Sequence, residues 1–276
     1  MIGTYREHVP PFLVLTLLPL DPLPTEPKGG ATTTDPAVLA EDVRQRHDGR
    51  GANQPWSVNA KIESRRAKLR EVGARLLASR GIDRVSMLEV ALTAGVTPYA
   101  ARSAYLRRHD LIFDILHAFV DALHEYVGTA DEGQEDALGE IRLEAVTAAL
   151  LDGILDHRDA HQISRSAFPL LTAAERETLQ YQLRTLAYRI GISLTAALPG
   201  LDATPELRQP LIQSLIAMAG HAPFWMKDDG PLGRGTYARL IAQTIIEGGR
   251  AQLADVRVGG RRGAGRARKT AGAQPG

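Results

Sequence analysis

Apolar residues recur at steps of three and four positions through most of the chain. One run is Leu179, Leu183, Leu186, Ile190 and Leu194, and another is Leu211, Ile212, Leu215, Ile216 and Ala219. This spacing places apolar side chains on one face of a helix. Alternating apolar runs bounded by turns, which indicate strands, are not found. The pattern predicts an all-α protein with about nine helices between residues 61 and 253.

Glycine and proline interrupt this pattern and predict where the helices end. The breaks are Gly81, Gly95, Gly128 to Gly133, Phe168-Pro169, Pro199-Gly200, Thr204-Pro205 and Asp228-Asp229-Gly230-Pro231. They leave two long final helices, about 205–226 and 231–253, whose apolar stripes are wider than one face. Paired with the same helices of a second copy, these two could form a four-helix dimer interface; a purely intramolecular core is the alternative.

Both ends of the chain lack helical periodicity. Residues 1–60 hold 8 of the 16 prolines, which remove backbone donors, and are predicted to form a disordered Pro-rich extension. The apolar stretch 12–20 within it is too short to span a bilayer, so no membrane partner is expected. Residues 254–276 are rich in Gly and Arg and are predicted to form a basic disordered tail.

Charge is nearly balanced over the whole chain but uneven along it. The 276 residues include 33 Lys and Arg, 32 Asp and Glu, and no Cys, which excludes disulfides and fits a cytoplasmic protein. Residues 61–110 hold 11 basic and 5 acidic side chains, a net +6, whereas residues 111–250 hold 11 and 19, a net −8. A basic block beside an acidic body indicates either a polyanion-binding module or a solvated helical surface.

The basic block has the pattern of two short helices joined by a tight turn. Ser86 and Glu89 have the spacing of a capping box, which predicts that a helix begins there. Gly95 supplies the backbone freedom that a tight turn needs. Thr97 followed by Pro98 is typical of a second helix start, with a hydroxyl cap and proline in the first turn. The segment therefore predicts a helix-turn-helix.

The second of these helices is expected to present an exposed face to DNA. Ala101 and Tyr105 lie four residues apart and should face the core, which leaves the opposite face open. That face holds Pro98, Tyr99, Arg102 and Ser103, and with Thr97 these are the candidate groove contacts. Arg66 and Arg108 flank it as candidate phosphate contacts. Each exposed arginine, taken alone, is equally well explained as ordinary surface charge.

These residues resemble the TetR (tetracycline-repressor-type) family of bacterial transcriptional regulators. The similarity runs through residues 66–81, 94–97 and 108–112, with a weaker match over 225–232. The resemblance implies an all-helical homodimer with an N-terminal three-helix DNA-binding domain and a larger C-terminal domain that binds a small effector and dimerises. Arg102, Ala104 and Leu88 depart from the family pattern, in which the first two positions hold aromatic residues or His and the third holds a cation. We expect altered operator preference, because a guanidinium can still read guanine.

The acidic body offers candidate residues for an effector site, since such a site needs apolar walls with a few polar anchors. They are His161, Phe168, Tyr181, Arg184, Tyr188, His221 and Trp225. Taken singly, each of these residues is better explained as an ordinary core or surface residue. His157 and His161 could share a helix face as metal ligands, but two solvated imidazoles explain them better, so no metal or cofactor is predicted. Motifs typical of enzymes are not found, and the carboxylates of residues 131–136 fit a solvated loop.

Together these observations predict four segments: the extension (1–60), a helix-turn-helix DNA-binding domain (61–110), a helical effector-binding and dimerisation domain (111–253) and the tail (254–276). The function predicted is that of a ligand-responsive transcriptional regulator acting at the cytoplasmic nucleoid, most simply a repressor released from a pseudo-palindromic operator by an effector. The alternative is an effector-binding dimer, a sensor or scaffold, whose helix-turn-helix no longer reads DNA. No enzymatic activity is predicted.

Overall fold

A computed structural model describes residues 55–227 and 230–271, with side chains for 60–227 and 230–256. Over these residues the chain forms nine α-helices and no β-strand, which confirms the predicted all-α class. The helices are α3 (Pro55–Arg80), α4 (Met87–Thr93), α5 (Pro98–Ala104), α6 (Arg108–Glu132), α7 (Gly139–Asp156), α8 (Arg158–Ala167), α9 (Ala173–Ala197), α10 (Pro205–His221) and α11 (Arg234–Ala271). Four 3-10 turns join them: η1 (Ile82–Arg84), η2 (Phe168–Leu170), η3 (Leu201–Ala203) and η4 (Ala222–Phe224).

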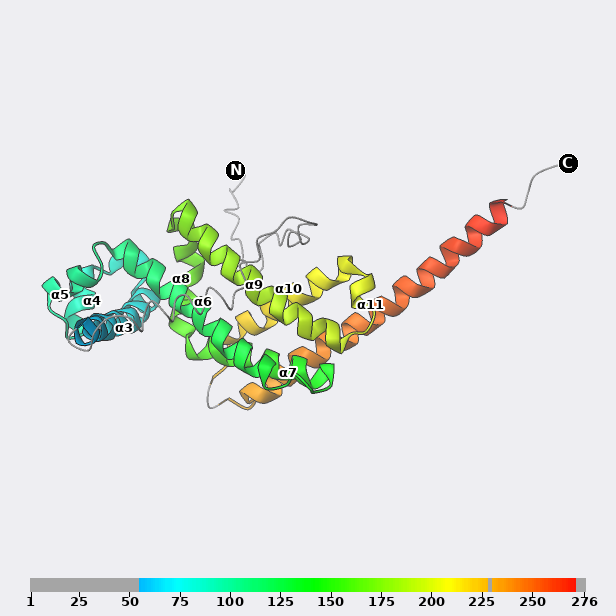
Figure 1. Cartoon of the computed structure of the whole chain (residues 1–276), viewed down its shortest axis with the longest axis horizontal. Helices are drawn as coiled ribbons and strands as arrows, with labels where there is room; N and C mark the ends of the chain where they lie inside the picture. The colour runs from blue at the N-terminus through cyan, green and yellow to red at the C-terminus, as the bar shows by residue number, and fades with distance from the viewer. Residues whose placement is uncertain (1–54, 228–229, 272–276) are drawn as a thin grey trace, which may run out of the picture.

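Helices α3, α4 and α5 pack together at one end of the molecule, and we call this unit the head (Figure 1). Its small core includes Leu69, Leu77, Val90 and Ala101, all at most 2% exposed. Gly81 ends α3 with a φ of 91°, a left-handed conformation that favours glycine. Helix α6 leads from the head into the remaining helices, so it belongs to the packing of both parts.

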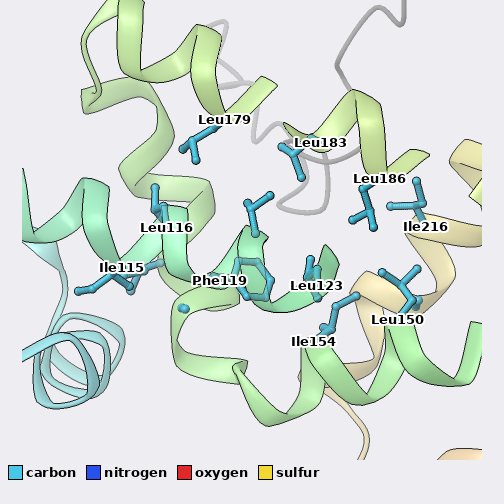
Figure 2. Close-up of a cluster of buried hydrophobic side chains, with 14 of the residues drawn as sticks. Ile115, Leu116, Phe119, Leu123, Leu150, Ile154, Leu179, Leu183, Leu186 and Ile216 are labelled. Carbon is cyan, nitrogen blue, oxygen red and sulfur yellow. The ribbon is translucent and has the colours of Figure 1, made fainter. Parts of the chain in front are cut away.

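The larger part, which we call the body, is built around α6, α7 and α9. Figure 2 shows apolar side chains of these three helices and of α10 meeting in one core. Leu123, Leu150 and Leu186 are each at most 1% exposed there, and burying such side chains stabilises the fold by roughly 1.5–3 kcal/mol each. Ile216 brings α10 to the same core. The body therefore holds its helices by apolar faces that recur at the spacing seen in the sequence.

Several helix boundaries differ from those predicted. Helix α3 begins at Pro55, before the predicted start at 61, and residues 1–54 of the predicted extension lie outside the described residues. Helix α6 runs through Gly128, because one glycine lowers helix stability by only about 1 kcal/mol and tertiary packing outweighs it. Helix α7 ends at Asp156, since the following His157 has a non-helical ψ of 34°.

The last helix also continues past its predicted end at residue 253. Helix α11 extends to Ala271, whereas the sequence pattern predicts a disordered tail from residue 254. Extending an existing helix adds a hydrogen bond per residue without a new nucleation step, so a helix can continue beyond the end of its apolar periodicity. Residues 272–276 of the predicted tail lie outside the described residues.

Candidate nucleic-acid interface

The helix-turn-helix of the head is held by the caps that the sequence predicts. Ser86 Oγ accepts a hydrogen bond from the backbone N–H of Glu89 at 3.2 Å, and Thr97 Oγ1 accepts one from Ala100 at 3.3 Å. The Glu89 carboxylate pairs with Arg80 of α3, so only the serine half of the predicted capping box is formed. Gly95 adopts a φ of 65° in the turn between α4 and α5. Both helix starts are therefore fixed by local sequence.

Helix α5 presents the exposed face that the helical spacing predicts. Ala101 and Tyr105 are 2% and 5% exposed on the inner side. On the outer side, Tyr99 is 87% exposed, and Pro98, Arg102 and Ser103 are also exposed. Thr97 is exposed too, but its hydroxyl already caps α5. The candidate groove contacts thus share one accessible surface at the end of the molecule (Figure 1).

A polar network behind α5 holds this surface against α3 and α6. The Tyr105 hydroxyl donates to Asp114 Oδ2 of α6, and Arg70 of α3 pairs with the same oxygen at 3.1 Å. Burial, followed by the hydrogen bond to Asp114, raises the pKa of Tyr105, so the phenol stays a donor at neutral pH. Sequence reasoning missed Asp114 and Arg70; their spacing from Tyr105 carries no motif that could have revealed them.

The two predicted phosphate contacts have different surroundings. Arg66 lies behind α5, where its guanidinium stacks 5.6 Å from the centre of the Tyr105 ring and donates to the Ala104 carbonyl at 3.4 Å. Arg108 lies at the start of α6 and donates to the Val85 carbonyl at 3.0 Å, with 37% of its side chain exposed. Arg108 is therefore the better placed of the two to meet a phosphate, and Arg66 is better placed to position α5.

An apolar groove borders the exposed face of α5. Leu88, Ala101, Arg102 and Leu106 are among its lining residues, and its volume is about 240 Å³. Leu88 and Leu106 are 55% and 82% exposed, although leucine is usually buried. Leu106 was not singled out from the sequence, because nothing in its spacing distinguishes it.

The candidate effector residues do not form a single cluster. His161 is buried, and its ring centre lies 6.2 Å from that of Phe224; the ring of His221 is tilted against the same Phe224 at 5.6 Å. Trp225 packs edge-on against Tyr237, and Phe168 is partly buried against the core. Tyr181, Arg184 and Tyr188 lie apart on α9, with both tyrosines exposed. Phe224, which the sequence did not single out, is the residue that joins two of the candidates.

Two further expectations concern metal ions and membranes. His157 is the N-cap of α8 with a non-helical ψ of 34°, and its carbonyl accepts from the backbone N–H of His161 at 3.0 Å. The part of the chain that the structure describes contains no group of three His, Asp or Glu side chains suited to a metal ion. Among the same residues, no helix is both long and apolar enough to cross a membrane.

The fold of this chain is similar to the folds of solved transcriptional regulators. No protein-family model and no curated protein sequence matches the chain. Among solved structures, a TetR-family transcriptional regulator from Bordetella parapertussis is 19% identical with a TM-score of 0.59, and covers 65% of this chain and 93% of its own. The ketosteroid transcriptional regulator KstR2 of Mycobacterium tuberculosis is 17% identical with a TM-score of 0.56, covering 67% and 94%.

A third solved structure shows AibR in complex with isovaleryl coenzyme A and operator DNA. It is 20% identical to this chain with a TM-score of 0.52, and covers 66% of this chain and 96% of its own. The fold is thus the helical fold of TetR-family transcriptional regulators, as the resemblance of residues 66–112 implies. At these identities the likeness concerns the fold, and the function must be argued from the chain's own residues.

Proposed function

We propose that this protein is a ligand-responsive transcriptional regulator that binds double-stranded DNA through α4 and α5. The capped helix-turn-helix with its exposed Tyr99, Arg102 and Ser103 is the observation that carries the proposal. A second helix held at its N-terminus by Thr97 and Pro98, and braced behind by Tyr105, can lie in the major groove without reorganising. The net +6 of residues 61–110 favours approach to phosphate.

The head and the body have different roles in this proposal. The head, residues 61–110, would bind DNA, and residues 111–253 would bind the effector and dimerise. Helix α11 is suited to dimerisation, because Ile241 and Ile245 are buried in the chain's own core while Leu240, Thr244 and Gly248 lie exposed on another face. A second copy seated on that face through α10 and α11 would form a four-helix interface. A two-fold dimer reads half-sites about 34–36 Å apart, or a multiple of that distance.

Effector binding would act on DNA affinity by favouring one arrangement of the two heads over another. The operator complex of AibR with isovaleryl coenzyme A supports this kind of response as an analogy. Helix α8 offers a direct physical connection, because Gln162 on α8 donates to the Ala78 carbonyl of α3 at 3.3 Å. Release from DNA by the effector, that is, repression, is the simplest form of the proposal.

Fluorescence anisotropy with the DNA upstream of the protein's own gene tests the proposal. We expect binding that weakens linearly on a plot of log affinity against log salt, with a slope of about −0.9 for each phosphate contacted. A scrambled duplex of the same length is the control, and specific binding should exceed it by about 10³-fold or more. Equal, weak binding to both duplexes at every salt concentration would contradict the proposal and favour the sensor or scaffold without DNA reading.

Arg102→Ala should change which sequences are bound. If the guanidinium reads a guanine, its loss costs about 1–3 kcal/mol at one base pair and relaxes the preference there. Arg108→Ala is the comparison, since loss of a phosphate contact should weaken all sequences alike and reduce the salt slope by about 1. Selection from a randomised duplex library measures both effects. An unchanged sequence profile for Arg102→Ala would remove Arg102 from the reading surface.

A further inference from the structure

A buried imidazole and an unpaired guanidinium lie one turn apart on α8. His161 is 4% exposed and meets the rings of Phe119 and Phe224 at centroid distances of 6.0 and 6.2 Å. The guanidinium carbon of Arg165 also lies over the Phe224 ring, 5.1 Å from its centre. Phe224 belongs to η4 and is 46% exposed, so this ring lies between the cluster and solvent on one side, while Arg165 is itself partly exposed. We call these residues the α8 cluster.

The imidazole of His161 has an unused hydrogen-bonding atom. Its Nδ1 is buried and has no hydrogen-bond partner among the described residues. Its Nε2 faces Gly220 of α10, where an added Cβ would lie 3.6 Å away. Burial, and secondarily the charge of Arg165, lowers the pKa of His161 to about 4, so the ring is neutral at pH 7 and carries one N–H. A buried polar atom without a partner is costly, and a bound ligand that supplies the missing partner would remove that cost.

The positive charge of Arg165 has no carboxylate partner among the described residues. None of their carboxylates forms an ion pair with it, whereas Arg70, Arg142 and Arg250 all have such partners. Burial lowers the pKa of Arg165, which means that its surroundings disfavour the charge that it keeps at neutral pH. A partly buried guanidinium is stabilised most by an anion that accepts two of its N–H groups.

We propose that the α8 cluster binds a small amphipathic carboxylate, with the carboxylate on Arg165 and His161 and the apolar part on Phe119 and Phe224. A single uncompensated guanidinium matches a monoanion better than a phosphate dianion. In this proposal one carboxylate oxygen accepts from the guanidinium, and the other accepts from an N–H at His161 Nδ1. Phe224 turns aside to admit the ligand, and its half-exposed position allows this.

This site deepens the proposed function, on which it rests, by naming the chemical class of the effector. It also lies on the helix that touches the head, since Gln162, between the two ligand-binding residues, donates to Ala78 of α3. Of the seven residues expected from the sequence to bind the effector, the α8 cluster uses His161. Arg165 and Phe224 are additions that only the folded chain brings together.

Binding of octanoate to the full-length protein tests the site, with 1-octanol as the uncharged control. We expect saturable octanoate binding in calorimetry and a change in tryptophan fluorescence, because Trp225 follows Phe224 directly. The alcohol should bind at least about tenfold more weakly than octanoate, because it lacks the charge. Absence of saturable octanoate binding, or equal affinity for the two probes, would overturn the proposal.

Variants separate the site from general effects on folding. Arg165→Gln and His161→Phe should each weaken octanoate binding about tenfold and leave octanol binding unchanged. Arg75→Gln, which removes the same charge from an exposed position of α3, should bind octanoate as the original protein does. Unchanged octanoate affinity in Arg165→Gln would overturn the proposal. Operator binding without octanoate binding would overturn this site alone, whereas octanoate binding without operator binding would overturn the proposed function.

Discussion

Asp131→Ala is expected to lower the free energy of unfolding by about 3–5 kcal/mol, the cost of breaking a buried ion pair. Asp131 lies near the end of α6 and is 9% exposed; its Oδ1 accepts from Arg142 Nε of α7 at 2.6 Å and from Ser193 Oγ of α9 at 2.9 Å. The hydrogen bond from Arg142 is the largest cause of the lowered pKa of Asp131. Loss of the carboxylate leaves the Arg142 cation partly buried without a partner.

Urea unfolding followed by circular dichroism measures this effect. Glu132→Ala is the matched control, because the neighbouring carboxylate is 80% exposed and lies 4.0 Å from Arg189. Removing an exposed acid should change stability by no more than about 0.5 kcal/mol. A similar small change for Asp131→Ala would show that the three helices do not depend on this buried acid.

Acidification from pH 7 to pH 4 is expected to destabilise the protein by about 3 kcal/mol through His161 alone. Burial lowers the pKa of this imidazole from 6.5 to about 4 in the folded state. The unfolded chain therefore takes up a proton between pH 6.5 and pH 4 while the folded chain does not. Stability is complete above pH 6.5 and is lost as the pH falls through this interval.

His161→Phe should remove this part of the acid dependence, because phenylalanine does not titrate. Unfolding free energies measured at several pH values between 7 and 4 would show a shallower slope for the variant. Ile163→Val, a change in a buried and non-titrating side chain on the same helix, keeps His161 intact and should follow the original slope. If His161→Phe and the original protein lost stability in parallel, the folded-state imidazole would have to titrate near its ordinary pKa.

The local features of the head could be predicted because they depend on near neighbours in the sequence. The caps at Ser86 and Thr97 and the turn at Gly95 involve residues within a few positions of one another. Helical spacing alone also separates the buried Ala101 from the exposed Arg102. The same reasoning could not show that Arg66 stacks on Tyr105, because the long stretch of sequence between them carries no information about that approach.

Two features of the body could not be predicted from near neighbours in the sequence. Asp131 lies in a hydrophilic stretch that predicts a solvated loop, yet it is buried and bonded to α7 and α9. The seven effector candidates share composition, but only His161 and His221 meet, through Phe224. In both cases the decisive partners come from distant helices, and their identity follows from packing.

The helical class, the position of the helix-turn-helix and the residues on its exposed face could all be predicted from the amino-acid sequence. These follow from periodicity, caps and turns, which are properties of short segments. Which charges are compensated depends on the folded structure: Asp131 pairs with Arg142, and Asp114 pairs with Arg70 and Tyr105. Arg165 has no acidic partner among the described residues. The reason is that electrostatic partners are set by distance in space, and helix packing alone determines that distance.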